Sequence, residues 1–300
     1  MYIEIQGIPQ WIQIETDNPQ NPILLLVHGG PGASTRFASS TWQSWRQHFT
    51  LVHWDQRGAG RTFAKNGPEF SAPMSFDQIV LDGIGVSEFL RSHLGQQRIF
   101  LLSHSWGSAI AVHMVKRRTD LFATFVGTGL LVNFDENEQA NYARELKQAA
   151  TSNNQAAIDA LTELGSPPYR NPDQIRILRE WSDKLTLGTG DTPQPRVKPS
   201  ADFSTEDREA MFRGFAFSVS TLFQDLCRID LASLGPDFDI PMYCIMGTHD
   251  QQTPMELAEH YFNSINAPHK DFIRFEGCHH FVHMNRPDAF LEALVRLLIK

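Results

Sequence analysis

The chain has 300 residues, of which 41% are hydrophobic and 20% charged, and this ordinary globular composition argues against wholesale disorder. Lys and Arg number 26 against 34 Asp and Glu, so the formal net charge is −8. A phosphate backbone repels an acidic protein, and no apolar run approaches the ~20 residues that span a bilayer, so we expect neither nucleic acid nor membrane as a partner.

The N-terminus and the cysteines bear on the cellular compartment. Residues 1–5 contain no basic segment followed by an apolar one, so no signal peptide is visible. Cys227, Cys244 and Cys278 are an odd number without C-x-x-C spacing, which disfavours a disulfide framework or a zinc ribbon. We therefore expect a cytoplasmic protein.

Strand-like and helix-like segments alternate through the first part of the chain and return at its end. Residues 2–7 and 11–15 are predicted to form an antiparallel hairpin at a sheet edge, with a turn at Gly7-Ile8-Pro9. Short apolar runs, typical of strands buried on both faces, occur at 23–28, 50–54, 98–103, 123–128 and 241–247, and a further strand is predicted at 272–275. Helical patterns occupy 75–94, where Ser75 and Gln78 predict a capping box, and 106–118 and 287–299. This alternation predicts a mainly parallel sheet with helices on both faces.

The middle of the chain has few strand signals. Residues 136–150 and 154–164 are predicted helices, and the segment 188–199, rich in Gly, Pro and Thr, is a predicted loop. The pattern therefore predicts an α/β core made of residues 1–129 and 239–300, interrupted by an α-helical insertion at 130–238.

The motif Ser103-His104-Ser105-Trp106-Gly107-Ser108 lies between a predicted strand and a predicted helix. A serine on such a sharp turn forms a nucleophile elbow, which pushes its hydroxyl out of the sheet toward a base. The motif departs from G-x-S-x-G because Ser103 replaces the first glycine, and we treat this small residue as a tolerated variant. The alternative is a serine-capped helix without chemistry.

A glycine-rich turn, His28-Gly29-Gly30-Pro31-Gly32, follows the predicted strand at 23–28. Its backbone N–H groups are candidates for an oxyanion hole, with the N–H of Gly30 as one donor and that of Trp106, after the serine, as the other. Gly29 is a further candidate for substrate contact. The alternatives are a phosphate-binding loop or a plain turn, but neither G-x-G-x-x-G nor G-K-[ST] is present.

A serine nucleophile needs a base and an orienting acid, which follow it in the order acid and then histidine on this kind of sheet. Asp250 comes just after the predicted strand at 241–247, and His280 follows the strand at 272–275. His279 is the alternative base, although the position of Pro287 favours His280. We therefore expect Ser105, Asp250 and His280 to form a catalytic triad.

Two further interpretations concern the surrounding histidines. His283 is a candidate cleft-lining residue. His279, His280 and His283, with His249 and the carboxylate of Asp250, are also compatible with a metal site. A metal site leaves the elbow and the glycine turn unexplained, so we expect no metal and no cofactor.

The segment Asp55-Gln56-Arg57-Gly58-Ala59-Gly60-Arg61 follows the predicted strand at 50–54. Its glycines predict a tight turn. We expect Asp55 and Arg57 to hold this loop by ion pairing and hydrogen bonds rather than to contact substrate.

Taken together, these motifs resemble the α/β-hydrolase family and, within it, the proline iminopeptidase-like branch. H-G-G-P-G at 28–32 joined to D-Q-R-G-x-G-R at 55–61 is specific to that branch, whereas the serine motif, Asp250 and His280 are shared more widely. The resemblance implies an α/β-hydrolase core with the helical insertion as a cap over the active site. It also implies a serine peptidase that removes an N-terminal residue, often proline, without a cofactor.

The predicted cap lacks the W-x-x-W-E segment with which typical proline iminopeptidases hold the free amine of the substrate. It contains Asn133-Phe-Asp-Glu-Asn-Glu138 instead, which makes Glu136 and Glu138 candidate amine-binding residues. The simpler interpretation, which we favour, is that these acids begin the solvated face of a helix.

We therefore predict a serine hydrolase that works through an acyl-enzyme, most consistent with an aminopeptidase acting on short peptides or amides. The alternative is an esterase, lactonase or amidase acting on a small molecule. A ligand-binding module that has lost turnover is a third hypothesis, disfavoured by the complete set of serine, acid and histidine.

Overall fold

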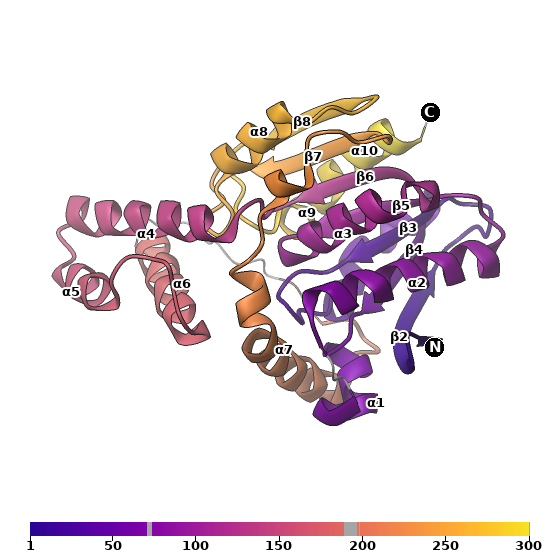
Figure 1. Ribbon diagram of the computed structural model, residues 1–300, viewed down its shortest axis with the longest axis horizontal. Helices are drawn as coiled ribbons and strands as arrows, with labels where there is room; N and C mark the ends of the chain where they lie inside the picture. The colour runs from indigo at the N-terminus through magenta and orange to yellow at the C-terminus, as the bar shows by residue number, and fades with distance from the viewer. Residues whose placement is uncertain (71–73, 189–196, 198, 300) are drawn as a thin grey trace.

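A single eight-stranded sheet forms the centre of the molecule (Figure 1), and the computed structural model describes residues 1–70, 74–188, 197 and 199–299 of the chain. The strand order is β1-β2-β4-β3-β5-β6-β7-β8, with β1 and β2 antiparallel and the pairs from β4 to β8 parallel. The strands are β1 (Tyr2–Ile5), β2 (Ile8–Glu15), β3 (Ile23–Val27), β4 (Thr50–Asp55), β5 (Ile99–His104), β6 (Phe122–Thr128), β7 (Met242–Gly247) and β8 (Lys270–Phe275).

The predicted strands are all present, and only the edge hairpin differs by more than two residues. Its turn lies at Gln6 and Gly7, both with positive φ, so β2 already begins at Ile8 and Pro9 lies within the strand. Proline is tolerated there because Pro9 precedes the part of β2 that pairs with β4 and is therefore paired on one side only.

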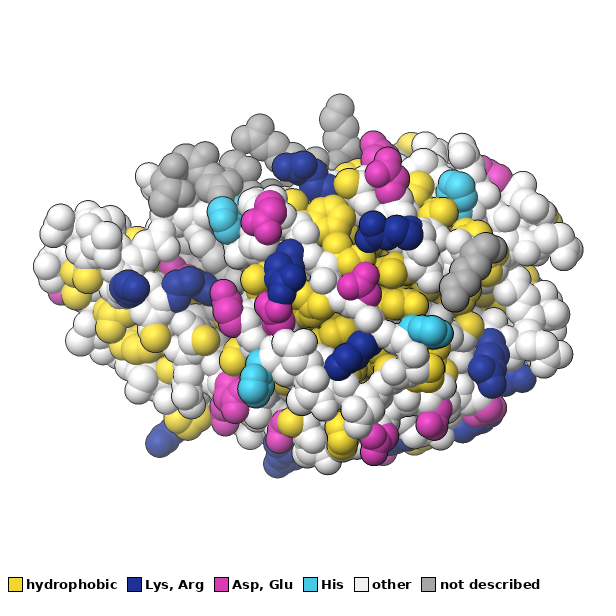
Figure 2. Space-filling view, turned by 90° about the horizontal axis from the view of Figure 1, so that it is seen from above, with side chains coloured by type: hydrophobic (Ala, Val, Ile, Leu, Met, Phe, Trp, Pro, Cys, Tyr) yellow, Lys and Arg dark blue, Asp and Glu magenta, His cyan; other side chains and the backbone are white. Residues whose placement is uncertain are grey.

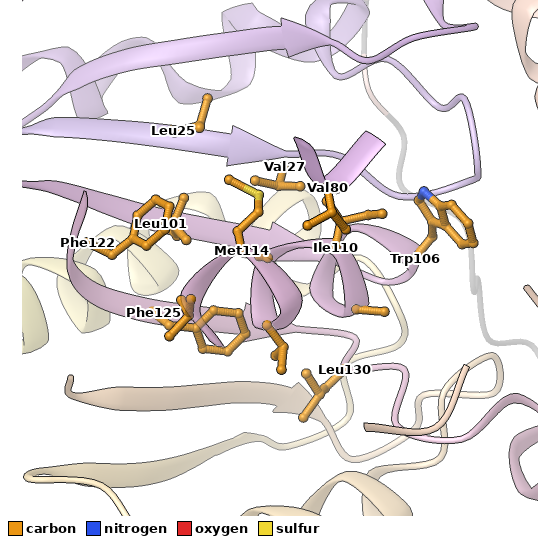
Figure 3. Packing of buried hydrophobic residues seen from close by; sticks show 14 of the residues in the cluster. Leu25, Val27, Val80, Leu101, Trp106, Ile110, Met114, Phe122, Phe125 and Leu130 are labelled. Atoms are coloured by element: carbon orange, nitrogen blue, oxygen red, sulfur yellow. The ribbon is translucent and has the colours of Figure 1, made fainter. Parts of the chain in front are cut away.

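The parallel strands β3 to β7 are largely buried on both faces, which explains their apolar sequences, whereas the edge strand β8 is partly exposed. In β3, Leu25 and Val27 pack on the layer that contains α3, where Ile110 and Met114 meet them (Figure 3). Leu24 and Leu26 belong to the opposite layer. Helices α2, α3 and α8 contribute to the first layer, and η1 and α10 to the second. The helices of the core are α1 (Gly60–Phe70), α2 (Phe76–Leu94), α3 (Trp106–Arg117), α8 (Met255–Ser264), α9 (Val282–Asn285) and α10 (Pro287–Leu298), with 3-10 segments η1 (Arg36–Gln47), η2 (Thr119–Leu121) and η3 (Leu231–Leu234).

The capping box predicted at the start of α2 is half present. The Ser75 side chain accepts a hydrogen bond from the Gln78 N–H at 3.1 Å. The Gln78 side chain donates to Asp82 at 3.0 Å instead. Asp82 is a buried, charged carboxylate that pairs with Arg57, and it therefore accepts the hydrogen bond of the Gln78 side chain.

Between β6 and β7, the described residues form the α-helices α4 (Phe134–Thr151), α5 (Gln155–Leu164), α6 (Pro172–Leu187) and α7 (Thr205–Leu226), followed by η3. In Figure 1, α4, α5 and α6 project away from the sheet and pack on one another around a small apolar cluster. Helix α7 lies against α1 instead. The sequence predicted α4 and α5 but not α6 and α7. The assignment of 130–238 to a separate cap stays a prediction, and most of the predicted loop at 188–199 is outside the described residues.

The contact between α7 and the core depends on a buried carboxylate. Asp207, near the start of α7, accepts hydrogen bonds from Arg36 at 2.7 Å and from Arg61 at 2.5 and 2.9 Å. Arg61 ends the D-Q-R-G-x-G-R motif, so this part of the motif holds α7 on the core. Breaking a buried pair of this kind is costly because it leaves an uncompensated charge.

The surface carries charges of both signs. Figure 2 shows Lys and Arg side chains interspersed with Asp and Glu over one face. Within the part of the chain that the structure describes, no helix has the length and apolar character needed to cross a bilayer.

Candidate active site

Ser105 occupies a sharp turn between the end of β5 and the start of α3. Its backbone has φ 54° and ψ −127°, a conformation that residues with a side chain rarely adopt and that costs of order 1–3 kcal/mol. Its N–H donates to the Thr128 carbonyl at 3.1 Å, and its own carbonyl accepts from the Ser108 N–H at 2.8 Å. The Ser105 residue is partly exposed. The structure therefore holds this serine at a strained, accessible turn, as the elbow motif predicts.

Gly107 allows the turn to form because α3 starts directly against the loop after β3. A Cβ at this position would lie 2.2 Å from the Val27 carbonyl oxygen and 2.4 Å from that of His28. Both obstacles are backbone atoms of the sheet and its glycine turn. A glycine is therefore required two residues after Ser105.

Replacing Gly107 with alanine is expected to destabilise the protein by about 3 kcal/mol or more, because the new methyl group can be accommodated only by moving backbone. Chemical denaturation measures this change. The matched control is Gly85→Ala in α2, where the nearest atom is the Cγ2 methyl group of the Ile5 side chain at 3.1 Å rather than a backbone atom. There the higher helix propensity of alanine should leave stability nearly unchanged or raised. A Gly107→Ala protein as stable as this control would contradict the steric argument.

Asp250 and His280 form a buried hydrogen-bonded pair. Asp250 lies in the loop after β7 and His280 in the loop after β8, so adjacent parallel strands bring them to the same edge of the sheet. The His280 Nδ1 atom is 2.9 Å from Asp250 Oδ2 and 3.1 Å from Oδ1. The imidazole is therefore oriented by the carboxylate, as a catalytic base requires.

The Asp250 carboxylate receives hydrogen bonds from its own loop. The N–H groups of Gln252 and Thr253 each donate to Oδ1 at 2.9 Å, and the Thr253 hydroxyl donates to Oδ2 at 2.8 Å. Burial by itself raises the pKa of Asp250, but the charge and hydrogen bond of His280 and these backbone N–H groups together bring the pKa below its ordinary value. Asp250 is therefore ionised at neutral pH.

Ser105 and His280 both contact the turn after β6. Ser105 is hydrogen-bonded to the Thr128 carbonyl, and the His280 ring packs on the next residue, Gly129. A Cβ on Gly129 would be 2.8 Å from His280 Cε1 and 3.0 Å from Nδ1. His104, which precedes the serine, also contacts the His280 carbonyl through Nε2 at 3.1 Å.

The glycine turn lies directly beside the serine. A Cβ on Gly29 would be 3.0 Å from the Ser105 Cβ. Gly30 has φ +117°, a backbone conformation that residues other than glycine adopt only with strain. His28 anchors the turn: its carbonyl accepts from the Gln56 side chain at 2.9 Å, and its Nε2 accepts from the Gln56 N–H at 3.2 Å. Burial lowers the pKa of His28 to about 4, so the ring is neutral and accepts this bond.

The Trp106 N–H is the first of α3 and belongs to the group of N–H groups that a helix start leaves without an intrahelical acceptor. Ser105, the Gly29–Gly30 turn and this N–H thus surround one point above the sheet. Together with the Asp250–His280 pair, they make up the parts that acyl transfer by a serine needs.

Comparison with known proteins agrees with this geometry. Residues 24–293 match the model of the alpha/beta hydrolase family. The chain belongs to the α/β-hydrolase family. It is 30% identical to the probable aminopeptidase YbaC of Bacillus subtilis, over 98% of this chain and 94% of that protein. It is also 30% identical to a proline iminopeptidase of Clostridioides difficile, over 99% of this chain and 97% of that protein.

The fold of this α/β hydrolase is shared with solved structures. The proline iminopeptidase of Mycobacterium smegmatis superimposes with a TM-score of 0.67 at 17% identity, covering 99% of this chain and 96% of that one. The predicted fold class and the resemblance to the proline iminopeptidase-like branch are therefore confirmed, and the protein is a hydrolase.

A pocket of about 530 Å³ opens in front of Ser105. Its floor includes Gly30, Pro31 and Trp106 from the core, and its walls come from α4, α6 and α7. The lining is largely apolar, with the side chains of Leu131, Phe134, Ile175, Phe215, Val219 and Leu226. Glu138, Asp173, Arg176 and Arg179 supply the charges.

The two acids predicted to hold an amine are in different environments. Glu136 is exposed on α4, as a helix-start residue would be. Glu138 is 1% exposed, lies in the pocket wall and pairs through Oε1 with Arg179. The favoured expectation of a solvated face was therefore wrong for Glu138. Its Oε2 atom is buried and has no hydrogen-bond partner among the residues that the structure describes.

The remaining histidines are placed apart from this pocket. His283 is buried beneath the site, where its ring stacks on Trp42 at 5.7 Å, so the expectation that it lines the substrate cleft does not match its position. Burial lowers the pKa of His283 to about 3. His279, the alternative base, lies beside His249, with ring centres 5.8 Å apart. Among the described residues, no three His, Cys, Asp or Glu side chains converge in a way that could hold a metal ion.

The D-Q-R-G-x-G-R motif is bonded within the core through an ion pair and hydrogen bonds to residues outside the loop. Arg57 pairs with Asp82 of α2 at 2.8 and 3.0 Å. Asp55 accepts from the Ser34 hydroxyl and from the Arg61 N–H at 2.8 Å, and burial raises its pKa to about 6. The expected loop-holding role therefore involves a partner that the sequence did not identify.

Several residues around the site had no signal in the sequence. Thr253 bonds Asp250 and lies 3.2 Å from His280 Nδ1, and Arg179 reaches Glu138 from α6. Asn137, Asn141 and Arg144 follow the spacing i, i+4, i+7 on α4. That spacing indicates one shared face of a helix but does not show what the face contacts.

Proposed function

We propose that Ser105 is the nucleophile, His280 its general base and Asp250 the acid that orients His280. In the first half-reaction the Ser105 Oγ bonds to the substrate carbonyl carbon while His280 Nε2 takes the hydroxyl proton. The same proton then goes to the leaving amine or alcohol, and the acyl-enzyme remains. In the second half-reaction water attacks the acyl carbon with His280 again as base, which releases the acid and restores Ser105.

The backbone N–H groups of Gly30 and Trp106 stabilise the oxyanion in both steps. Such donors are effective because they are already oriented before charge develops. The observation that carries the proposal is the 2.9 Å contact between His280 Nδ1 and Asp250 beside the strained turn at Ser105.

For the substrate we propose an aminopeptidase activity on short peptides or amino-acid amides. The probable aminopeptidase and the proline iminopeptidase described above support it, each matched over nearly its whole length. The pocket supports it as well, because Glu138 lies in its wall and the Oε2 atom of this carboxylate has no hydrogen-bond partner among the described residues. An ammonium group in such a pocket needs a carboxylate partner.

Two substrates and one blocked analogue test this proposal. Proline β-naphthylamide, its N-acetylated form and a p-nitrophenyl ester are assayed with the same enzyme preparation. An aminopeptidase should hydrolyse the free-amine substrate with a kcat/KM at least ~10-fold higher than that for the N-acetylated form, because one charge-assisted contact to the amine contributes a factor of this size. Equal rates on the free and blocked amides would reject it. Rapid hydrolysis of the ester alone would support an esterase, the second candidate, which the largely apolar lining of the pocket also fits.

Glu138→Gln is expected to raise the KM for the free-amine substrate roughly 10- to 100-fold, because a charge-assisted hydrogen bond is worth about 1.5–3 kcal/mol. The p-nitrophenyl ester, which has no amine, should keep its kcat/KM within about 3-fold, the usual range for a change that leaves the reacting atoms alone. The matched control is Glu136→Gln, on the same helix but exposed. Equal losses on both substrates would show that Glu138 acts only in the structure of the pocket wall.

A further inference from the structure

Two consecutive peptide groups orient the Asp250 carboxylate. The group between Gln251 and Gln252 donates its N–H to Oδ1 at 2.9 Å, and the group between Gln252 and Thr253 does the same at 2.9 Å. Each of these groups has a carbonyl at its other end. What holds those carbonyls therefore also determines where the two N–H groups point.

Both carbonyls are held by side chains of α4. Arg144 Nη2 donates to the Gln251 carbonyl at 2.7 Å. Asn137 and Asn141 donate through Nδ2 to the Gln252 carbonyl at 2.6 and 3.0 Å. Asn137 and Asn141 are buried, and the side chain of Arg144 is 31% exposed.

Helix α6 holds the same loop through a side chain. Thr186 Oγ1 donates to Gln251 Oε1 at 2.5 Å, and Ser182 Oγ lies 3.4 Å from the same atom. The loop after β7 is thus enclosed by the inserted helices, although its own strand belongs to the core. A hydrogen bond to a carbonyl polarises the N–H of the same peptide group, so these contacts also strengthen the donors to Asp250.

We propose that Asn137, Asn141 and Arg144 are positioning residues that orient the carboxylate of Asp250 through the two peptide groups of residues 251–253. This inference rests on the proposed role of Asp250 as the acid of the triad. The position of α4 on the core therefore determines how well the Asp250 carboxylate orients the His280 ring. An enzyme in which α4 is displaced hydrolyses its substrate slowly even when Ser105 is accessible. In this role the three residues act through the loop of Asp250. Asn137 also lines the pocket in front of Ser105, so the tests use Asn141 and Arg144, which are not among the residues that line it.

Asn141→Leu tests the inference because leucine is similar in size but cannot donate to the Gln252 carbonyl. We expect kcat for a p-nitrophenyl ester to fall about 5- to 10-fold, the effect of one lost hydrogen bond, with KM changed less than about 2-fold. The low-field proton NMR resonance of His280 Nδ1–H should shift or broaden. Gln148→Leu is the matched control on α4, because the Gln148 side chain donates to the Leu185 carbonyl of α6 at 3.2 Å rather than to a carbonyl of the Asp250 loop.

A second variant covers the case in which Asn141→Leu does not fold. Arg144 also pairs with the buried Glu145 at 2.7 Å, so Arg144→Met is made together with Glu145→Gln and compared with Glu145→Gln alone. The same fall in kcat and the same change in the resonance are expected, and Arg144→Lys should recover part of both because it keeps a cationic donor.

Folded variants with unchanged kcat and an unchanged His280 resonance would overturn the inference. A fall in kcat without any change in the resonance would also overturn it, because α4 would then act elsewhere than on the Asp250–His280 pair. Failure of the proposed function has a different signature: the wild-type protein would show no Ser105-dependent turnover. The resonance then still decides whether α4 positions Asp250.

Discussion

Replacement of Ser105 with alanine is expected to lower kcat/KM by about 10⁴- to 10⁶-fold, because the variant lacks the hydroxyl oxygen that forms the acyl bond in the proposed mechanism. The oxyanion donors and the pocket remain, and they account for the residual rate over the uncatalysed reaction. Alanine keeps the Cβ and the backbone bond to Thr128, so the free energy of unfolding should change by less than about 1 kcal/mol.

The measurement combines turnover with covalent labelling. A fluorophosphonate probe should label the wild-type protein at Ser105 and leave the variant unlabelled. Ser92→Ala, on the exposed face of α2, is the matched control and should keep both properties. More than roughly 10% residual activity in the Ser105→Ala protein would exclude this serine as the nucleophile, since losing a triad member costs orders of magnitude.

Asp250→Asn should cost about 10⁴-fold in kcat, and the hydrogen bonds of the carboxylate explain why. Two backbone N–H groups point at Oδ1, so the amide oxygen must take that position. The amide nitrogen then faces His280 Nδ1, 2.9 Å away in the native pair. His280 must accept there, its proton moves to Nε2, and the base can no longer take a proton from Ser105.

The expected signature is a slow enzyme with an intact fold. Labelling by the fluorophosphonate should slow together with turnover, while thermal unfolding stays cooperative. Asp271→Asn, at an exposed position of β8, is the control for the chemistry of the substitution. Rapid turnover by the Asp250→Asn protein would mean that another acid orients His280.

The sequence was informative wherever a local rule decides the structure. The short apolar runs predicted the parallel strands because both of their faces are buried, and S-x-G after a strand predicted the strained turn at Ser105. The chain order of Ser105, Asp250 and His280 indicated the composition of the site, because the ends of parallel strands meet at one edge of the sheet.

Contacts between distant segments were not predictable in the same way. Arg57 was expected to hold its loop by ion pairing, but the sequence did not identify the partner. That partner is Asp82 on α2, which is buried at the same point of the core. Glu136 and Glu138 are two residues apart on one helix, so their side chains point in different directions. Glu138 lies in the pocket wall and Glu136 faces solvent. Helix periodicity shows that they diverge, but only the packing of α4 shows which one is buried.

The amino-acid sequence by itself determined the α/β architecture, the elbow serine, the glycine turn and the family, because each depends on residues that are neighbours along the chain. Only the tertiary structure decided which carboxylate enters the pocket, where His283 lies and how α4 reaches the loop of Asp250. Those features depend on how the inserted helices pack against the sheet, and packing between segments more than 100 residues apart has no local signature in the sequence.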